Sequence, residues 1–281
     1  MSHFVQPASR LFPTMTAHHV FRLAGRDQFQ GQCLNVSISD LCHAIVGAGF
    51  LLVKPVPRPD WLSRDLLPDR IISASSCICP QFPRSYAIRW CRDSDEARTE
   101  AFDAIGLVAE KREEAMDWAT EEFEKAFGWP GVFLTLGAAR KARAQFFADS
   151  DLVVIGVGLP EQHCAAFVSH ATPAPPEPGF APVGKSGALS VVEAARPLPP
   201  PAAILGYEPL NVENGQIDHS WLCNHLEEHV AKDLGIRPGS TGLLQSLADA
   251  SRCCESIEHG EIGAEPGPWF PWLLAQYHDT A

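Results

Sequence analysis

The sequence has no long hydrophobic run. No stretch of its 281 residues approaches the roughly 20 apolar residues of a membrane span. The first thirty residues also lack the run of about 7–15 apolar residues that a signal peptide requires. The apolar character of this segment is interrupted by polar residues, among them His18, His19, Arg22 and Arg26. We therefore expect a cytoplasmic protein that does not bind a membrane.

Basic residues are scarce in the second half of the chain. Residues 151–281 hold 5 Lys+Arg against 16 Asp+Glu, a charge of −11, whereas residues 1–150 hold 17 against 18, a charge of −1. Binding to nucleic acid requires clustered Lys and Arg to neutralise phosphates, so we expect no nucleic-acid partner. A basic protein partner is compatible with this charge, because complementary fields speed the encounter of two proteins. An acidic surface that only keeps the protein in solution is the alternative.

The nine cysteines follow no recognised disulfide or metal pattern. An odd number leaves at least one thiol unpaired, and the adjacent Cys253 and Cys254 suit an ordinary disulfide poorly. Cys77 and Cys79 are one residue apart, unlike the two-residue spacing of a CxxC motif. We therefore expect reduced thiols; a composite metal or redox site built from these two pairs is the alternative.

The order of apolar patterns indicates an α/β fold, a layered mixed sheet with flanking helices. Residues 151–159 (DLVVIGVGL) are apolar on both faces and predict a central strand. We divide the chain into a less regular N-terminal region, 1–110, and a C-terminal α/β domain, 115–281. Within that domain residues 173–201 hold nine prolines, so we expect an extended loop over about 171–202.

Periodicity and turn residues predict the remaining elements. Helices are expected over residues 99–127, 135–147, 160–168, 218–234 and 241–258. Shorter strands are expected over residues 49–56, 86–90, 132–134 and 204–207. The aromatic stretch 268–277 (PWFPWLLAQY) is broken by prolines, and it predicts an edge strand or a segment that covers the core.

Four residues of metal-ligand type lie close together in the sequence: His219, Cys223, His225 and His229. On the expected helix, at about 100° per residue, they form two pairs on nearly opposite faces. One helix cannot wrap all four around one zinc, so we predict no metal. A half-site completed elsewhere and a catalytic Cys223–His219 pair remain alternatives.

Motifs for other chemistry are missing. There is no GxSxG and no P-loop, and Gly156-Val157-Gly158 lacks the third glycine of a dinucleotide fingerprint. We therefore assign no catalytic residue and no cofactor from motifs. A small hydrolase or transferase with a site near His219, Cys223 and Glu265 is the alternative.

Residues 263–272 combine prolines and glycines with two tryptophans, and tryptophan often anchors protein interfaces. If this turn packs near the start of the helix expected at 218–234, carboxylates surround aromatic anchors. The alternative is that these rings fill the core. The predicted partner-binding residues are Asp218, His219, Trp221, Asn224, Glu227, Glu228, Glu265, Trp269 and Trp272.

Two stretches, 204–228 (ILGYEPLNVENGQIDHSWLCNHLEE) and 263–273 (GAEPGPWFPWL), resemble an uncharacterised bacterial protein family that is itself similar to immunity proteins of polymorphic toxin systems. The resemblance covers about the last 165 residues and implies no catalytic residue. It implies an immunity-type inhibitor whose partner is a basic toxin domain. A structural adaptor in a secretion or phage-defence locus is a further possibility.

Overall fold

The computed structural model describes residues 44–75, 107–121, 127–128, 132–176, 178, 184–213, 215–260 and 262–279. The chain divides into two compact units, Met1–Asn35 and Val36–Ala281, and every described residue belongs to the second. Its strands are β1 (Ile45–Val53), β2 (Val56–Pro57), β3 (Arg70–Ile71), β4 (Phe127–Gly128), β5 (Val132–Phe133), β6 (Val153–Pro160), β7 (Ala203–Glu213), β8 (Gln216–Ser220) and β9 (Trp269–Tyr277). Its helices are α3 (Ala109–Glu121), α5 (Leu136–Phe146), α6 (Glu161–Ala171), α7 (Gly187–Glu193) and α8 (Leu247–His259), with a π-helical turn η1 (His229–Asp233).

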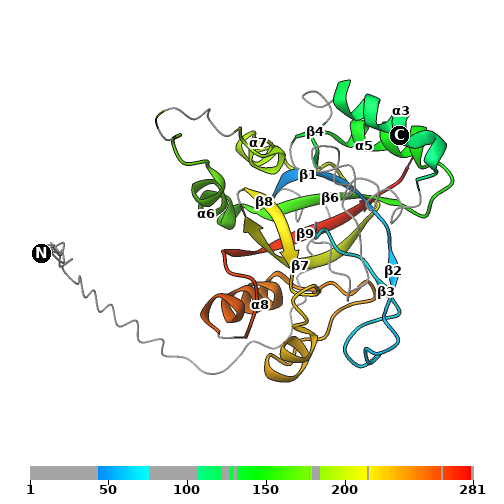
Figure 1. The fold of residues 1–281 in the computed structure, drawn as a ribbon. Helices are drawn as coiled ribbons and strands as arrows, with labels where there is room; N and C mark the ends of the chain where they lie inside the picture. The colour runs from blue at the N-terminus through cyan, green and yellow to red at the C-terminus, as the bar shows by residue number, and fades with distance from the viewer. Residues whose placement is uncertain are drawn as a thin grey trace, which may run out of the picture. The chain divides into compact units, whose positions relative to one another are not determined.

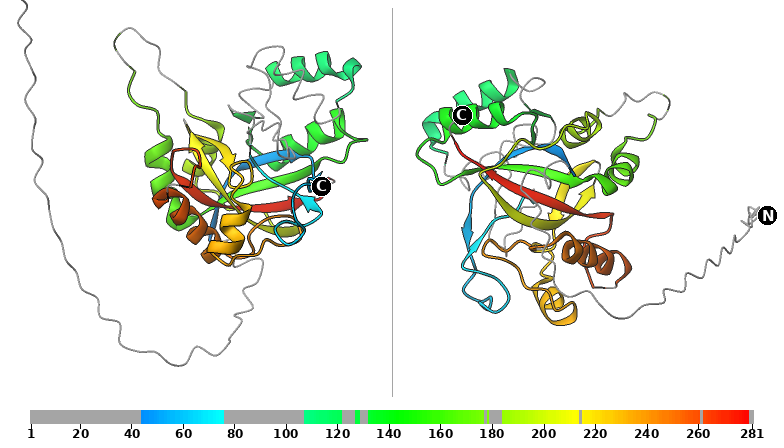
Figure 2. Two further views of the ribbon diagram at one scale, coloured as in Figure 1. Left: turned by 60° about the horizontal axis from the view of Figure 1, so that its bottom comes forward. Right: turned by 180° about the vertical axis from the view of Figure 1, so that it is seen from behind.

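The main sheet is curled and has the strand order β4-β5-β1-β6-β9-β7-β8 (Figure 1). Its four long strands, β1, β6, β9 and β7, lie side by side, and Figure 2 shows their curvature from two further directions. They are rich in aliphatic and aromatic residues and nearly continuously buried. Such runs form strands that are covered on both faces. Every strand pair among the described residues is antiparallel.

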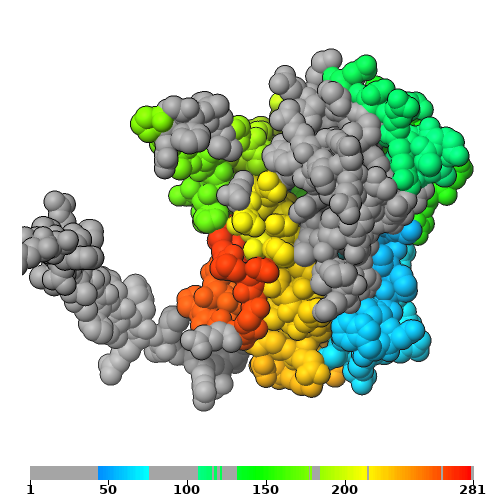
Figure 3. All heavy atoms as spheres, viewed as in Figure 1, coloured from blue at the N-terminus to red at the C-terminus, as the bar shows by residue number. Residues whose placement is uncertain are grey.

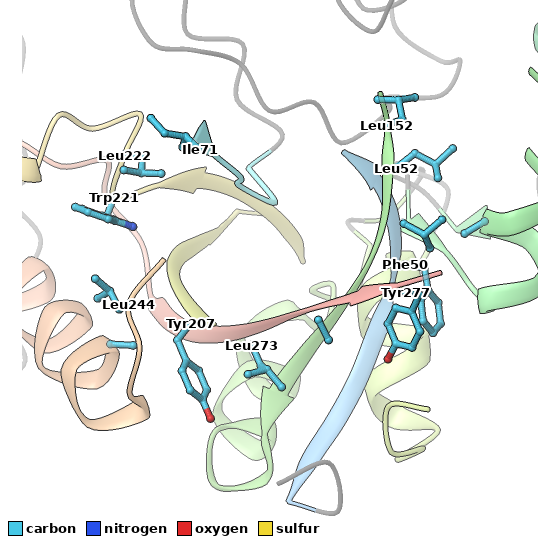
Figure 4. Packing of buried hydrophobic residues seen from close by; sticks show 14 of the residues in the cluster. Phe50, Leu52, Ile71, Leu152, Tyr207, Trp221, Leu222, Leu244, Leu273 and Tyr277 are labelled. Carbon is cyan, nitrogen blue, oxygen red and sulfur yellow. The ribbon is translucent and has the colours of Figure 1, made fainter. Parts of the chain in front are cut away.

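Helices cover the sheet on both faces, and each face has its own hydrophobic core. One core joins α3, α5 and α8 to the sheet; there Phe50 and Tyr277 meet edge to face, with 5.6 Å between ring centroids (Figure 4). The other core lies under α6 and α7. Its centre is an aromatic group in which Phe167 meets Trp272 at 5.2 Å and 88°.

A bulge in β7 brings the sheet against the segment that precedes α8. Gly206 has φ +139°, and a Cβ at this position would lie 2.7 Å from the carbonyl oxygen of Leu244. The neighbouring Tyr207 exchanges backbone hydrogen bonds with Leu244 at 2.7 and 2.8 Å. Glycine is therefore required here by both its conformation and the close approach of the backbone.

The expected α/β fold with flanking helices is confirmed, although the strand pairing is antiparallel where a mixed sheet was expected. The proposed boundary at 110–115 cuts through one sheet, because β1 pairs with β6 along its length. The reason is the apolar content of β1, which is buried on both faces. The stretch 268–277 forms a central strand, β9, rather than an edge.

The proline-rich stretch is not simply an extended loop. Between Pro182 and Pro197 lies a segment without proline, and α7 forms within it. Ser186 caps this helix by accepting a hydrogen bond from the Leu189 N–H, and Leu189 and Leu198 are buried. The prediction of an extended loop over 171–202 is therefore wrong for this part.

The prediction of a helix over residues 218–234 is also wrong. These residues form the end of β8, a series of turns and η1. His225 has φ +56°, a left-handed conformation that interrupts an α-helix.

The strand expected at 86–90 and the pair Cys77 and Cys79 lie outside the described residues. Among the described residues, no helix has the length and apolar composition needed to cross a membrane.

Candidate functional site

A buried carboxyl group lies at the base of the β7–β8 hairpin. Leu210 pairs with Ser220 in this hairpin, so Glu208, two residues before Leu210, shares a sheet face with Ser220. The Ser220 hydroxyl donates to Glu208 Oε1 at 2.6 Å, and the Ala74 N–H donates to Glu208 Oε2 at 2.7 Å. One fully buried side chain thus connects the hairpin to the segment that follows β3.

The environment of Glu208 shifts its proton affinity. Burial raises its pKa to about 7, against the opposing effect of hydrogen bonds from Ser220, Ser73 and Ala74. Burial disfavours the charged form of a carboxyl group, whereas donated hydrogen bonds favour it. Glu208 therefore changes charge near neutral pH, within the fold's interior.

The thiol of Cys223 contacts the backbone at the end of β8. It accepts a hydrogen bond from the Ser220 N–H at 3.1 Å and donates to the Ser220 carbonyl oxygen at 3.2 Å. The hydroxyl of Ser75 lies 3.9 Å from the sulfur, and the same hydroxyl donates to the carbonyl oxygen of Asp218 at 2.7 Å. The thiol is thus held between the turn after β8 and the 73–75 segment.

His219 lies within hydrogen-bonding distance of this thiol. Its Nδ1 is 3.6 Å from Cys223 Sγ, and its Nε2 is 3.9 Å from Asp218 Oδ2. The backbone N–H of His219 donates to the side chain of the buried Asn211 at 2.7 Å. If Nδ1 of the neutral ring accepts a hydrogen bond from the thiol, the ring carries its own hydrogen on Nε2, facing the Asp218 carboxylate.

Asn224 connects the thiol to the 263–267 turn. Its Nδ2 donates to the Ser220 carbonyl oxygen at 2.9 Å and lies 3.7 Å from Cys223 Sγ. Its Oδ1 accepts from the Glu265 N–H at 2.8 Å, which fixes the orientation of the amide. The second hydrogen of Nδ2 is directed at the sulfur of the thiol.

A thiol, an imidazole, a carboxylate and an oriented amide thus gather around one point. This combination can supply a nucleophile, a general base and a donor for a developing oxyanion. The alternative Cys223–His219 pair considered from the sequence is in contact, although through turns rather than along a helix. Glu265 contributes its backbone N–H, while its side chain is exposed.

The predicted aromatic partner-binding surface is absent. Trp221 and Trp272 are 0% exposed and Trp269 is 3% exposed, because all three fill the two cores. Trp269 Nε1 donates to the carbonyl oxygen of Glu265 within the turn, at 3.2 Å. These rings are therefore unavailable as exposed anchors, and the prediction for them is wrong.

The carboxylates predicted to bind a partner differ in their exposure to solvent. Glu227 is 4% exposed, and burial raises its pKa to about 7. Glu228 is exposed and pairs with Lys232 at 2.8 Å. The structure brings Asp218, His219 and Asn224 together around Cys223, and it leaves Glu228 outside this group.

Sequence reasoning missed Glu208, Asn211 and Ser75. The available signal for Glu208 was a carboxylate directly after the predicted strand 204–207, next to apolar residues, since buried charges are kept only where they have partners. Ser75 offered no such signal, because it reaches the site from 148 residues away along the chain.

The other two histidines of the sequence cluster lie elsewhere. His229 binds Asp233 and Ser256 at 2.8 and 2.7 Å, and His225 lies beside the exposed ring of Trp61, 5.9 Å between centroids. Within the described ranges, no group of three or more His, Cys, Asp or Glu side chains is arranged to hold a metal ion.

Comparisons with protein-family models, curated proteins and solved structures found no match.

Proposed function

We propose that the protein is a cysteine-dependent hydrolase or acyl transferase with Cys223 as its nucleophile. The observation that carries this proposal is the 3.6 Å contact between Cys223 Sγ and His219 Nδ1. A thiol is activated for attack by an adjacent base that takes its proton. This proposal takes up the alternative that the sequence left open at His219 and Cys223.

The reaction follows from the positions of these groups. His219 Nδ1 accepts the thiol proton, and the thiolate attacks the acyl carbonyl of an ester or amide while the amide hydrogen of Asn224 stabilises the oxyanion. The imidazolium then returns the proton to the departing alcohol or amine, leaving a thioester on Cys223. Water, or an acceptor amine, attacks the thioester with His219 again as base, and the acid or new amide leaves as the thiol reforms. The Asp218 carboxylate stabilises the imidazolium present between these steps.

The test uses p-nitrophenyl acetate as a generic acyl donor. We expect nitrophenolate release, with an acetyl group found on Cys223 by mass spectrometry of the rapidly quenched protein. Cys223→Ala should remove both signals. Cys164→Ala is the matched control, because Cys164 is half-buried, like Cys223, and its pKa is raised by burial. Equal acetylation of Cys223 and Cys164 at rates typical of a free thiol would sink the proposal.

A second candidate, immunity-type binding of a basic toxin domain, is favoured by exposed carboxylates just before η1, on α8 and in the turn before β9. Glu228, Glu255 and Glu265 are exposed there. The His229–Ser256 and Asn224–Glu265 hydrogen bonds connect the three segments, and Figure 3 shows α8 and the turn (orange to red) beside the chain after β7 (yellow). Both candidates suit the cytoplasm, where thiols stay reduced.

The two candidates separate experimentally. If a toxin gene adjoins this one, reversing Glu228, Glu255 and Glu265 to Lys should slow association with the toxin at low salt and have little effect at high salt. Cys223→Ala should leave that binding intact. Unchanged association of the triple variant at low salt would exclude this face as the binding surface.

A further inference from the structure

Glu208 holds both of the segments that surround the Cys223 thiol. Through Oε1 it accepts from Ser220, whose backbone N–H donates to the sulfur. Through Oε2 it accepts from Ala74, whose neighbour Ser75 lies 3.9 Å from the sulfur. Glu208 touches neither the thiol nor His219 through any hydrogen bond between described residues, so its influence on them passes through these two segments.

We propose that Glu208 is a positioning residue that fixes the Cys223 thiol through Ser220 and the 73–75 segment. The inference rests on the proposed nucleophilic role of Cys223. It assigns a function to a carboxyl group that the acyl-transfer steps do not use.

The hydrogen bonds explain why a carboxylate is needed. Ser220 Oγ already accepts from the Leu222 N–H at 3.1 Å, so its own hydrogen is best donated to Glu208. The Ala74 N–H is a second donor aimed at the same group. An ionised carboxyl accepts at both oxygens, whereas a neutral carboxyl or an amide presents one donor end. Loss of the charge therefore forces the Ser220 hydroxyl to turn or the 73–75 segment to move.

Among the residues that the structure describes, the titratable groups in contact around the thiol lie on and after β8. Asp218 and His219 belong to β8, and Cys223 follows it. The raised pKa of Glu208 arises from its burial, and the hydrogen bonds from Ser220, Ser73 and Ala74 oppose this rise. The pH profile of the thiol should therefore contain the ionisation of Glu208 in addition to those of His219 and Cys223.

The experiment measures alkylation of Cys223 by iodoacetamide between about pH 5.5 and pH 9, with the modified peptides quantified by mass spectrometry. Glu208→Gln keeps the shape of the side chain and removes its charge. Glu227→Gln is the matched control: Glu227 is also buried, with a raised pKa, but its Oε1 has no partner among the described residues. Cys164 serves as an internal reference thiol.

We expect E208Q to change the alkylation rate of Cys223 at neutral pH by about tenfold or more, because one hydrogen bond to a charged group corresponds to a factor of roughly 10–150. The pH profile of Cys223 alkylation in E208Q should lose the step near the pKa of Glu208. The alkylation of Cys164 in E208Q, and that of Cys223 in E227Q, should match the natural protein. A Cys223 profile identical in E208Q and the natural protein would overturn the inference.

Two outcomes keep this test separate from that of the proposed function. If Cys223 forms no acetyl intermediate but its alkylation still responds to E208Q, the positioning role stands and the acyl-transfer function fails. If E208Q does not fold, Ser220→Ala replaces it, because this change removes the hydrogen bond to Glu208 and keeps the backbone N–H that meets the sulfur. A Cys223 profile unchanged in S220A would then overturn the inference.

Discussion

Replacing Glu208 by Gln should make the protein's stability less sensitive to pH. The folded protein holds the Glu208 proton up to about pH 7, whereas an unperturbed glutamate releases it near 4.5. Rising pH between these values therefore favours the unfolded chain. One pKa unit corresponds to about 1.4 kcal/mol, so from about pH 5 to about pH 8 this group alone lowers the free energy of unfolding by about 2–3 kcal/mol. Glutamine does not ionise and avoids this loss.

The assay is urea unfolding of the natural protein and E208Q across this pH range. For a slope of about 2–3 kcal/mol per molar urea, the difference between the two midpoints should change by about 1 M, in favour of E208Q at the higher pH. Glu265→Gln, at an exposed position, is the control. The difference between its urea midpoint and that of the natural protein should stay constant with pH. A constant difference between E208Q and the natural protein at all pH values would show that Glu208 does not titrate as its burial requires.

Three further changes follow from described contacts. Trp272→Ala removes the buried ring that meets Phe167, and it should lower the free energy of unfolding by about 3–5 kcal/mol in urea denaturation. Ser186→Ala removes the cap of α7; it should cost about 1 kcal/mol, and limited proteolysis should cut the 187–193 segment only in this variant. His219→Ala should slow acyl transfer from p-nitrophenyl acetate by about 10²–10⁴-fold, the range for loss of a general base, and an unchanged rate would remove His219 from the mechanism.

The sequence predicted those helices and strands for which the apolar pattern and the local propensity indicate the same structure. The run 151–159 becomes β6, a central strand, because a segment that is apolar on both faces is stable only when both faces are covered. The helix expected at 241–258 appears as α8 only from Leu247 onward, where Ser246 caps the first turn; the residues before it form turns and a bridge to Tyr207. In both cases local propensity and burial favour the same structure.

The stretch 218–234 shows how a correct burial pattern can predict the wrong element. Leu222, Leu226 and Val230 recur at helical spacing and are all buried as expected. Turns around the left-handed His225 bury the same side chains without an α-helix. Spacing alone reports which residues face the core, and here the hydrogen bonds of Ser220 and Asn224 determine the backbone.

The candidate site was predictable only in part. His219 and Cys223 are four residues apart, so their contact could be considered from the sequence. The carboxyl group that anchors the site binds a backbone amide 134 residues away. Such a pairing depends on how β7 and the chain after β3 meet in the folded sheet, and no local pattern encodes it.

The position of β9 has a consequence for the order in which the chain can fold during synthesis. β9 is made after all the other strands described, yet it lies between β6 and β7 and pairs with both. Until residues 269–277 leave the ribosome, the nascent chain holds two half-sheets, each with a long apolar edge that lacks its neighbour. Exposed edges of this kind pair readily with other chains. Stalled or truncated translation products should therefore aggregate or occupy chaperones, and variants that delay the docking of β9 should reduce the yield of folded protein more than its final stability.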